Sequence, residues 1–194
     1  MSQNSDQHLI KRLKKGDNQA FRALIEQYKH MVYTLALRIV KNEEDAEEVS
    51  QDTFIKVYQS IGSFKGDSKL STWLYRIAYH RSLDYVKKNK RKLQTTQLEW
   101  EETTNIQLAE MTWDHMEAME KREIIQAALK HLPGEDGVIL SLFYFESLSL
   151  KEIAGVLDIT NNTVKVRLHR SRKRLASLLE KMLDKQIISS YASK

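Results

Sequence analysis

Cysteine is absent from this chain of 194 residues, proline occurs once, at Pro133, and glycine occurs six times. Without cysteine the chain can form neither a disulfide nor a thiolate metal site, and this composition suits a reducing compartment. No apolar run approaches the roughly 20 residues of a transmembrane helix, and the first 19 residues lack the apolar core of a signal peptide. We therefore expect no membrane insertion and a cytoplasmic location.

Scarce proline and glycine leave long amphipathic stretches, and no stretch alternates between apolar and polar residues as a half-buried strand does. Hydrophobic residues make up 41% of the chain, enough for small cores. The sequence therefore predicts an all-α fold of one or two small domains.

Positive charge exceeds negative charge by five, and the pI is near 9.2, which suits a polyanionic partner. Residues 76–92 contain seven Lys or Arg and one acid, whereas residues 93–120 contain seven acids and neither Lys nor Arg. A second basic stretch follows at 161–179. This pattern indicates two basic modules joined by an acidic linker at 93–120.

Residues 149–174 have the pattern of two short helices joined by a tight turn. Ser149 and Glu152 are spaced as a capping box for the first helix. Asp158 tolerates the left-handed backbone that such a turn needs, and Thr160 can cap the second helix. The stretch is typical of a helix-turn-helix.

The second of these helices separates apolar from basic residues. Val164, Leu168 and Leu175 share one face, and no acid interrupts residues 161–179. A basic helix is often only a solvated surface, but its combination with the caps and the turn favours a helix that enters a DNA major groove. The other face carries Lys165, Arg167, Arg170, Arg172, Lys173 and Arg174.

Three helices are predicted before residue 62: residues 6–15, a long helix from Asp17 or Asn18 to about Val40, and a helix capped by Asn42 that runs to Ile61. The outer face of the third helix is acidic, with an apolar residue at its centre. Taken alone it is a solvated face; as a functional surface it would dock a basic protein. Its residues include Asp45, Glu48, Gln51, Asp52 and Ile55.

Residues 64–88 interleave aromatic and basic side chains on a further helix expected to begin near Thr72, after a cap at Ser71. Aromatic residues at helical spacing more often form a core, but a core does not need Arg and Lys between its rings. The mixture suits unpaired nucleic acid, whose bases stack on rings and whose phosphates meet cations.

These motifs together resemble bacterial sigma factors of the sigma-70 family. Residues 16–92 resemble the family's first conserved domain: DAEEVSQDTFIKVYQSI (45–61) resembles the part that grips core RNA polymerase, and FKGDSKLSTWLYRIAYHRSLDYVKK (64–88) the part that melts and reads the −10 element. The helix-turn-helix resembles the last domain, which reads the −35 element. The chain lacks the additional domains of a housekeeping member and so resembles the extracytoplasmic-function (ECF) type.

The resemblance implies two helical domains, 1–92 and 121–194, joined by the linker 93–120. It implies that the outer face at 45–55 binds the β′ clamp helices of core polymerase, and that an anti-sigma factor is a further partner. Residues expected at the −10 single strand are Phe64, Lys65, Asp67, Ser68, Lys69, Trp73, Arg76, Tyr79, His80 and Arg81. Residues expected at the −35 duplex are Asn162, Thr163, Lys165, Val166, Arg167, His169, Arg170, Arg172 and Lys173.

Two residues depart from the family pattern. His80 stands where many members carry Asn, which puts the identity of the captured base in doubt, and Gly137 stands where a basic residue is common. Two other classes remain open: a conventional helix-turn-helix regulator that binds duplex operators, and an anti-sigma-type inhibitor that binds protein.

Catalytic chemistry is not expected. The six histidines are scattered without the spacing of a metal-binding pair, and no glycine-rich phosphate loop is present. We therefore predict no enzyme activity, no metal or other cofactor, and no small-molecule substrate.

Overall fold

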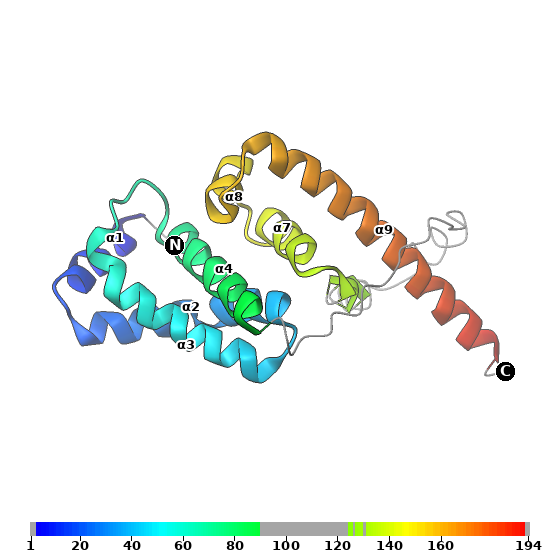
Figure 1. The fold of residues 1–194 in the computed structure, drawn as a ribbon, viewed down its shortest axis with the longest axis horizontal. Helices are drawn as coiled ribbons and strands as arrows, with labels where there is room; N and C mark the ends of the chain where they lie inside the picture. The colour runs from blue at the N-terminus through cyan, green and yellow to red at the C-terminus, as the bar shows by residue number, and fades with distance from the viewer. Residues whose placement is uncertain (1–2, 90–123, 126, 130, 193–194) are drawn as a thin grey trace.

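The computed structural model describes residues 3–89, 124–125, 127–129 and 131–192, in which regular structure is helical and no strand occurs. Two small helical domains are present, which confirms the predicted all-α class (Figure 1). The linker 93–120 lies outside the described residues. In chain order the elements are α1 (Gln3–Lys14), α2 (Asn18–Val40), α3 (Glu43–Ser60), the 3-10 turn η1 (Ile61–Ser63), α4 (Leu70–Asn89), α7 (Gly134–Tyr144), α8 (Leu150–Leu157) and α9 (Asn161–Ala192).

Side-chain caps fix where α2 and α3 begin. The Asp17 carboxylate accepts hydrogen bonds from the backbone N–H groups of Gln19 and Ala20, at 2.9 and 3.1 Å. The Asn42 side chain accepts from the backbone N–H of Asp45 at 2.9 Å. Each cap satisfies donors that have no partner within the helix, which confirms both predicted starts.

The N-terminal domain is a bundle in which α2 packs against both α3 and α4. The face of α3 opposite the predicted outer face is buried throughout. Burial of one such aliphatic side chain contributes about 1.5–3 kcal/mol, so this core sets the orientation of the α3 outer face. The buried residues of this face are Ala46, Val49, Thr53, Phe54, Val57 and Ile61.

The helix-turn-helix is formed by α8 and α9, as predicted. Ser149 and Glu152 make the reciprocal capping box, with the Glu152 carboxylate accepting from the Ser149 N–H at 2.8 Å. Asp158 adopts the left-handed conformation, with φ of 58°. The Thr160 hydroxyl accepts from the backbone N–H of Thr163 at 3.2 Å and caps α9.

One helix start differs from the expectation. α4 begins at Leu70 rather than near Thr72, so Ser71 lies inside its first turn and does not cap it. α7, for which the sequence analysis gave no start, begins at Gly134, directly after the proline. Proline has its φ already close to the helical value, so a chain leaving it can enter a helix at once. Before the proline, residues 124–125, 127–129 and 131 are described and helical.

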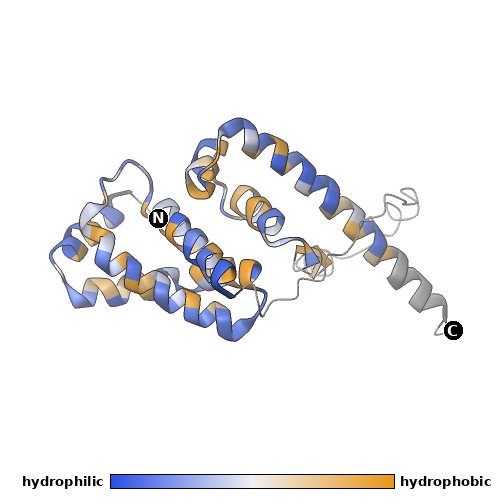
Figure 2. Cartoon of the chain, in the orientation of Figure 1, coloured by the Kyte–Doolittle hydropathy of each residue, from blue (hydrophilic) through white to orange (hydrophobic). Residues whose placement is uncertain are grey.

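The two domains pack against each other, with α4 against α8 and α2 against α7. Their buried side chains form one continuous apolar cluster, which includes Leu24 and Leu74 from one domain and Leu140 and Ile153 from the other. Figure 2 shows hydrophilic residues along the outer sides of α3 and α9. Gly134 permits close approach here, because a Cβ at this position would lie 3.2 Å from the backbone oxygen of Arg38.

Candidate nucleic-acid interface

The second helix of the helix-turn-helix is oriented by its apolar side. Val164 and Leu168 are buried, at 0% and 4% exposed, so the opposite side of α9 faces solvent. Val166 is 48% exposed, so its methyl groups are accessible to a partner. Exposed on this side are Asn162, Lys165, Val166, His169, Arg170, Arg172 and Lys173, while Thr163 and Arg167 are half-buried.

Two arginines of α9 are positioned by α7. Arg167 donates from Nη1 to Oε2 of Glu135 at 2.8 Å. The Arg172 guanidinium lies 5.3 Å from the ring centroids of Phe143 and Tyr144. Both cations are thus held at the edge of the exposed basic face rather than left to rotate freely.

The remaining cations of that face are unpaired within the described part of the chain. Lys165, Arg170 and Lys173 make no ion pair there. Cations that are exposed and unpaired are available for phosphates or base edges.

A buried carboxylate, which sequence reasoning missed, fixes α9 against α7. Asp136 is only 8% exposed and accepts a hydrogen bond from the Ser171 hydroxyl at 2.5 Å. It also accepts from Nη1 of Arg174. The residues are 35 and 38 positions apart, so no local pattern could have revealed the network.

Aromatic residues of the predicted −10 region divide into buried and accessible groups. Phe64 and Tyr79 are buried, at 5% and 3% exposed, and burial raises the pKa of Tyr79 to about 12. The half-buried Trp73 packs on Phe64, with ring centroids 5.1 Å apart. His80 packs edge-on against Tyr79 at 5.4 Å. The buried rings therefore support Trp73 and His80 from beneath.

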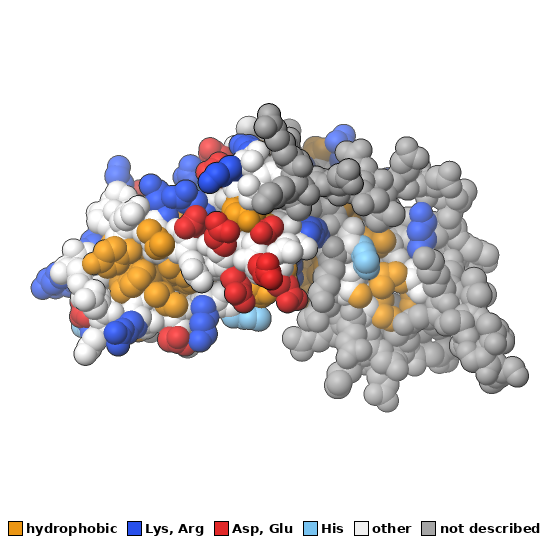
Figure 3. All heavy atoms as spheres, turned by 60° about the horizontal axis from the view of Figure 1, so that its bottom comes forward, with side chains coloured by type: hydrophobic (Ala, Val, Ile, Leu, Met, Phe, Trp, Pro, Cys, Tyr) orange, Lys and Arg blue, Asp and Glu red, His pale blue; other side chains and the backbone are white. Residues whose placement is uncertain are grey.

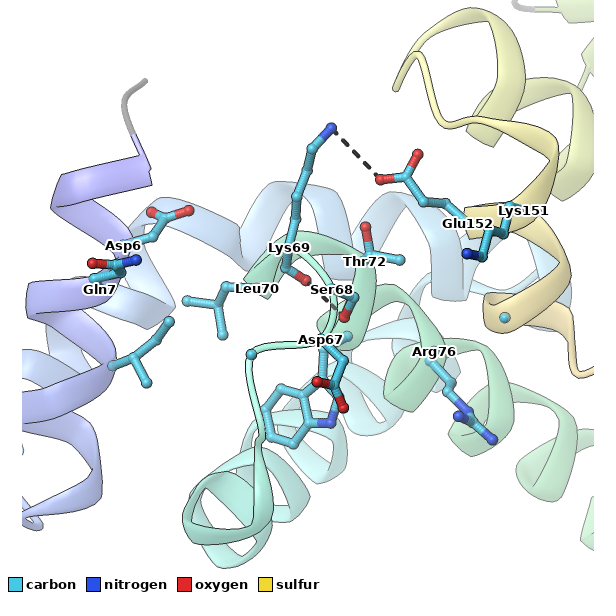
Figure 4. Close-up of a pocket in the computed structure, with 14 residues that line it drawn as sticks. Asp6, Gln7, Asp67, Ser68, Lys69, Leu70, Thr72, Arg76, Lys151 and Glu152 are labelled. Carbon is cyan, nitrogen blue, oxygen red and sulfur yellow. Dashed lines mark hydrogen bonds and ion pairs between the residues drawn. The ribbon is translucent and has the colours of Figure 1, made fainter.

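Two hollows flank α4. The first, of about 460 Å³, has Trp73, Arg76, His80 and Arg81 in its wall. The second, of about 740 Å³, lies between residues 66–76, α1 and α8 (Figure 4). Gly66 turns the loop above it with φ of 84°, a conformation that side-chain-bearing residues rarely adopt. The exposed loop residues are Lys65, Asp67, Ser68 and Lys69.

The outer face of α3 joins an acidic patch to an apolar one, as Figure 3 shows on that side of the molecule. Ile55 is 55% exposed and Tyr58 is 48% exposed, and Tyr58 packs on Phe21 at 4.9 Å between ring centroids. Tyr58 follows Ile55 by three residues on the same face, a signal that was available in the sequence and missed. The acidic part contains Glu44, Asp45, Glu47, Glu48 and Asp52.

One acid of this face has a second role inside the domain. Asp45 accepts a hydrogen bond from the Tyr85 hydroxyl at 2.5 Å and so ties α3 to α4. That hydrogen bond is the main cause that raises the pKa of Tyr85 to about 12. Asp45 is accordingly half-buried, whereas Glu48, Gln51 and Asp52 are exposed.

Gly137, the second departure from the family pattern, is buried in α7. A Cβ there would lie 3.3 Å from the Leu129 backbone oxygen. The glycine thus allows a close approach between α7 and the preceding segment.

Groups of three or more potential metal ligands do not occur in the part of the chain that the structure describes. Within the same residues, every helix is too short or too polar to cross a bilayer.

Comparison with known proteins gives the family. Residues 24–92 match the model for Sigma-70 region 2, and residues 122–175 match the model for Sigma-70, region 4. The chain is 34% identical over 176 residues to the ECF RNA polymerase sigma factor SigW of Bacillus subtilis, covering 88% of this chain and 94% of that protein. The chain belongs to the ECF sigma factors of the sigma-70 family.

Other relatives agree with this assignment. The sigma factor is 31% identical over 190 residues to the RNA polymerase sigma-H factor of Pseudomonas aeruginosa, covering 94% of this chain and 98% of that protein. It also shares its fold with proteins in two solved complexes, each 22% identical. CnrH with the cytosolic domain of CnrY has a TM-score of 0.63 over 91% of this chain and 97% of that chain. RpoE with the anti-sigma factor NepR from Bartonella quintana has a TM-score of 0.60 over 82% and 96%.

The general role follows from the family. A sigma factor recruits core RNA polymerase to promoters, so core polymerase and promoter DNA are the partners of this chain. Its relatives are sigma factors, which are not enzymes.

Proposed function

We propose that three surfaces of this sigma factor each bind a different partner during transcription initiation. The outer face of α3 binds the β′ clamp helices of core polymerase. The loop 64–69 and α4 capture the −10 element as a single strand, and α9 reads the −35 element as duplex. The observation that carries the proposal is the orientation of α9, whose buried Val164 and Leu168 direct the unpaired cations outward.

The −35 residues divide by their position on α9. Residues at the start of a recognition helix reach base edges, whereas residues farther along or at its sides meet the backbone. Contacts with bases are assigned to Asn162, Lys165, Val166, His169 and Arg170, close to the helix start at Asn161. Contacts with phosphates are assigned to Arg167, Arg172 and Lys173, two of which α7 already holds in place.

The −10 strand is assigned to the hollow beside α4. Trp73 supplies a ring for stacking, Arg76 and Arg81 supply charge, and His80 can donate or accept a hydrogen bond as an Asn would. Phe64 and Tyr79 support Trp73 and His80 from below, because both rings are buried. Lys65, Asp67, Ser68 and Lys69 contact the strand from the loop.

The α3 face is assigned to core polymerase because it combines exposed acids with an exposed apolar centre. Asp52→Arg reverses a charge next to Ile55 on a fully exposed position. We expect the variant to keep its helix content and lose co-purification with core polymerase, whereas Glu26→Arg, an exposed position on α2, keeps it. Normal co-purification of the Asp52→Arg protein would refute this docking face.

Transcription from a cognate promoter by purified core polymerase plus this chain tests the whole scheme. A sigma factor of this kind binds duplex weakly alone and gains affinity with core enzyme, whereas an operator-binding regulator binds tightly alone. We further propose an anti-sigma factor as a regulatory partner, the domain limits 1–92 and 121–194, a cytoplasmic location and the absence of any catalytic activity. A solved neighbour bound to an anti-sigma factor supports the first of these.

A further inference from the structure

Three arginines of α9 contact α7, which lies alongside it (Figure 1), and α7 holds them in two different ways. Nη1 of Arg167 donates to Oε2 of Glu135 at 2.8 Å, and Nη1 of Arg174 donates to Oδ2 of Asp136. Each of these two cations therefore has a carboxylate that offsets its charge. Arg172 makes no ion pair with the described residues and lies against two aromatic rings instead.

The rings belong to Phe143 and Tyr144, the last two residues of α7. Cζ of Arg172 lies 5.3 Å from the centroid of each ring, within the roughly 6 Å at which an aromatic face attracts a cation. The two ring centroids are 5.0 Å apart and the ring planes meet at 84°, so the guanidinium lies in a corner between them. The C-terminal end of a helix also carries a partial negative charge, which favours a cation at this place.

The two rings differ in how firmly the fold holds them. Phe143 is half-buried and packs on the main apolar core, so its ring is fixed. Tyr144 is 54% exposed, and its ring lies against Phe143 and Arg172. Phe145, the next residue, is exposed to nearly the same extent, at 52%, but makes no ring contact with another aromatic or cationic side chain of the described chain. The chain thus contains a natural comparison for the Tyr144 ring.

A cation held by aromatic faces keeps its charge and its hydrogen-bond donors. An ion pair such as that of Arg167 with Glu135 uses donors and cancels charge, whereas a ring face restrains the guanidinium and leaves its N–H groups free. Arg172 is therefore oriented without being neutralised. This is the state in which an arginine forms its strongest hydrogen bonds with a phosphate.

Arg172 also lies on the side of α9 that is assigned to DNA. It follows Lys165 by seven residues, so the two side chains are about 20° apart around the helix and about 10 Å apart along it. Arg172 thus shares a face with a residue assigned to base edges, two turns farther from the helix start. Side chains in that position meet the DNA backbone.

We propose that Phe143 and Tyr144 are positioning residues of the −35 interface, which hold the fully charged Arg172 toward one backbone phosphate of the duplex. The end of α7 thereby contributes to DNA binding through α9. The inference rests on the proposed function, in which Arg172 meets a phosphate of the −35 element.

The test removes the rings and leaves the cation. Phe143→Leu/Tyr144→Ser keeps an apolar side chain at the half-buried position and removes both aromatic faces. Phe145→Ser removes a ring of matching exposure one residue later and is the control. Tyr144→Phe keeps the ring and removes the hydroxyl. Each variant is made in the full chain with Arg172 present and with Arg172→Ala.

The first readout is the affinity of reconstituted holoenzyme for labelled promoter fragments with intact or scrambled −35 sequences, at four salt concentrations. The double ring variant should bind both sequences about two- to fivefold more weakly, the effect of losing an exposed cation–π contact. Arg172→Ala should lower the salt slope by about 0.9, because one phosphate contact is lost. With Arg172→Ala already present, removing the rings should cost nothing further. Phe145→Ser and Tyr144→Phe should match the wild type.

The second readout is NMR of the free chain, which reports the contact without DNA. Ring currents should shift the side-chain protons of Arg172 upfield in the wild type, and the double ring variant should return them to ordinary values. Arg172→Ala assigns these signals.

The possible results separate the positioning role from the proposed function. An equal loss of affinity with and without Arg172 would overturn the positioning role, as would an equal loss in Phe145→Ser or Tyr144→Phe, or unshifted Arg172 protons in the wild type. If Arg172→Ala changes neither affinity nor salt slope, the phosphate assignment in the proposed function is refuted, and the positioning role with it. If the double variant fails to fold by circular dichroism, Tyr144→Ser alone, at an exposed position, must reproduce the pattern.

Discussion

Lys165 and Lys173 of α9 provide the sharpest test of how this sigma factor reads the −35 element. They are eight residues apart, so they lie about 12 Å apart along the helix axis and about 80° apart around it. Lys173 thus lies a little over two turns beyond Lys165, where side chains of a recognition helix meet the DNA backbone rather than base edges. Lys165 lies in the second turn from the helix start at Asn161, where base contacts are made.

The two Ala substitutions should therefore weaken DNA binding in different ways, one only on the correct sequence and the other on every sequence. Lys165→Ala should lower affinity about 5–150-fold on the correct −35 sequence, equivalent to about 1–3 kcal/mol, and leave binding to a scrambled −35 sequence nearly unchanged. Lys173→Ala should weaken both sequences alike and reduce the salt slope by about 0.9, because one phosphate contact is lost. Between 50 and 200 mM salt, that slope corresponds to a change of about 3.5-fold in the ratio of wild-type to variant affinity.

The assay is binding of the reconstituted holoenzyme to labelled promoter fragments at four salt concentrations, with intact and scrambled −35 sequences. Lys29→Ala, which removes an exposed cation of α2, serves as the control and should match the wild type. Equal losses by both α9 variants on both sequences, with equal salt slopes, would show that α9 makes only backbone contacts. The base readout assigned to residues 162–170 would then be wrong.

Three further predictions concern the supports of these surfaces. Asp136→Ala should lower the free energy of unfolding by about 1–3 kcal/mol in urea, because it removes the acceptor of Ser171 and Arg174, whereas Glu135→Ala on the exposed side should cost less than about 0.5 kcal/mol. Ser149→Ala should cost about 1 kcal/mol through loss of the α8 cap, and an unchanged melting temperature would contradict that role. Tyr85→Phe removes a hydroxyl whose pKa is raised from 10.0 to about 12, so its stabilising effect is complete below pH 10 and is lost as pH rises through 12. Urea midpoints of wild type and Tyr85→Phe should therefore differ at pH 9, and the difference should shrink steadily between pH 10 and 12; a difference at pH 12 as large as that at pH 9 would exclude the bond to Asp45.

Local features of this chain could be predicted from the sequence because they depend on residues within about one helical turn. The caps at Asp17, Asn42 and Ser149 and the left-handed turn at Asp158 are all of this kind. The inward stripe of α3 follows from the same periodicity. The start of α4 was misplaced by two residues because beginning a helix one or two positions earlier or later changes its free energy little.

The sequence predicted which residues belong to the candidate site, but it predicted much less well which of them are exposed to solvent. Aromatic and basic residues of the −10 region look equivalent in the sequence, yet Phe64 and Tyr79 are buried and Trp73 is partly accessible. Helical periodicity separates faces of one helix, but whether a face meets solvent depends on which other helix covers it. For α4 those helices are α2, α3 and α8, and α8 begins 80 residues after α4 does.

The sequence by itself determined the helices, the helix-turn-helix, the segregation of charge and the family. Each of these depends on the spacing of residues close together in the chain or on the order of the motifs along it. Only the tertiary structure decided how those parts are paired. The contacts of Asp136 with Ser171 and Arg174, of Tyr75 with Glu146, and of Arg76 with Asp158 each join residues more than thirty positions apart. Such partners are selected by the packing of whole helices around one core, a three-dimensional property that local spacing does not encode.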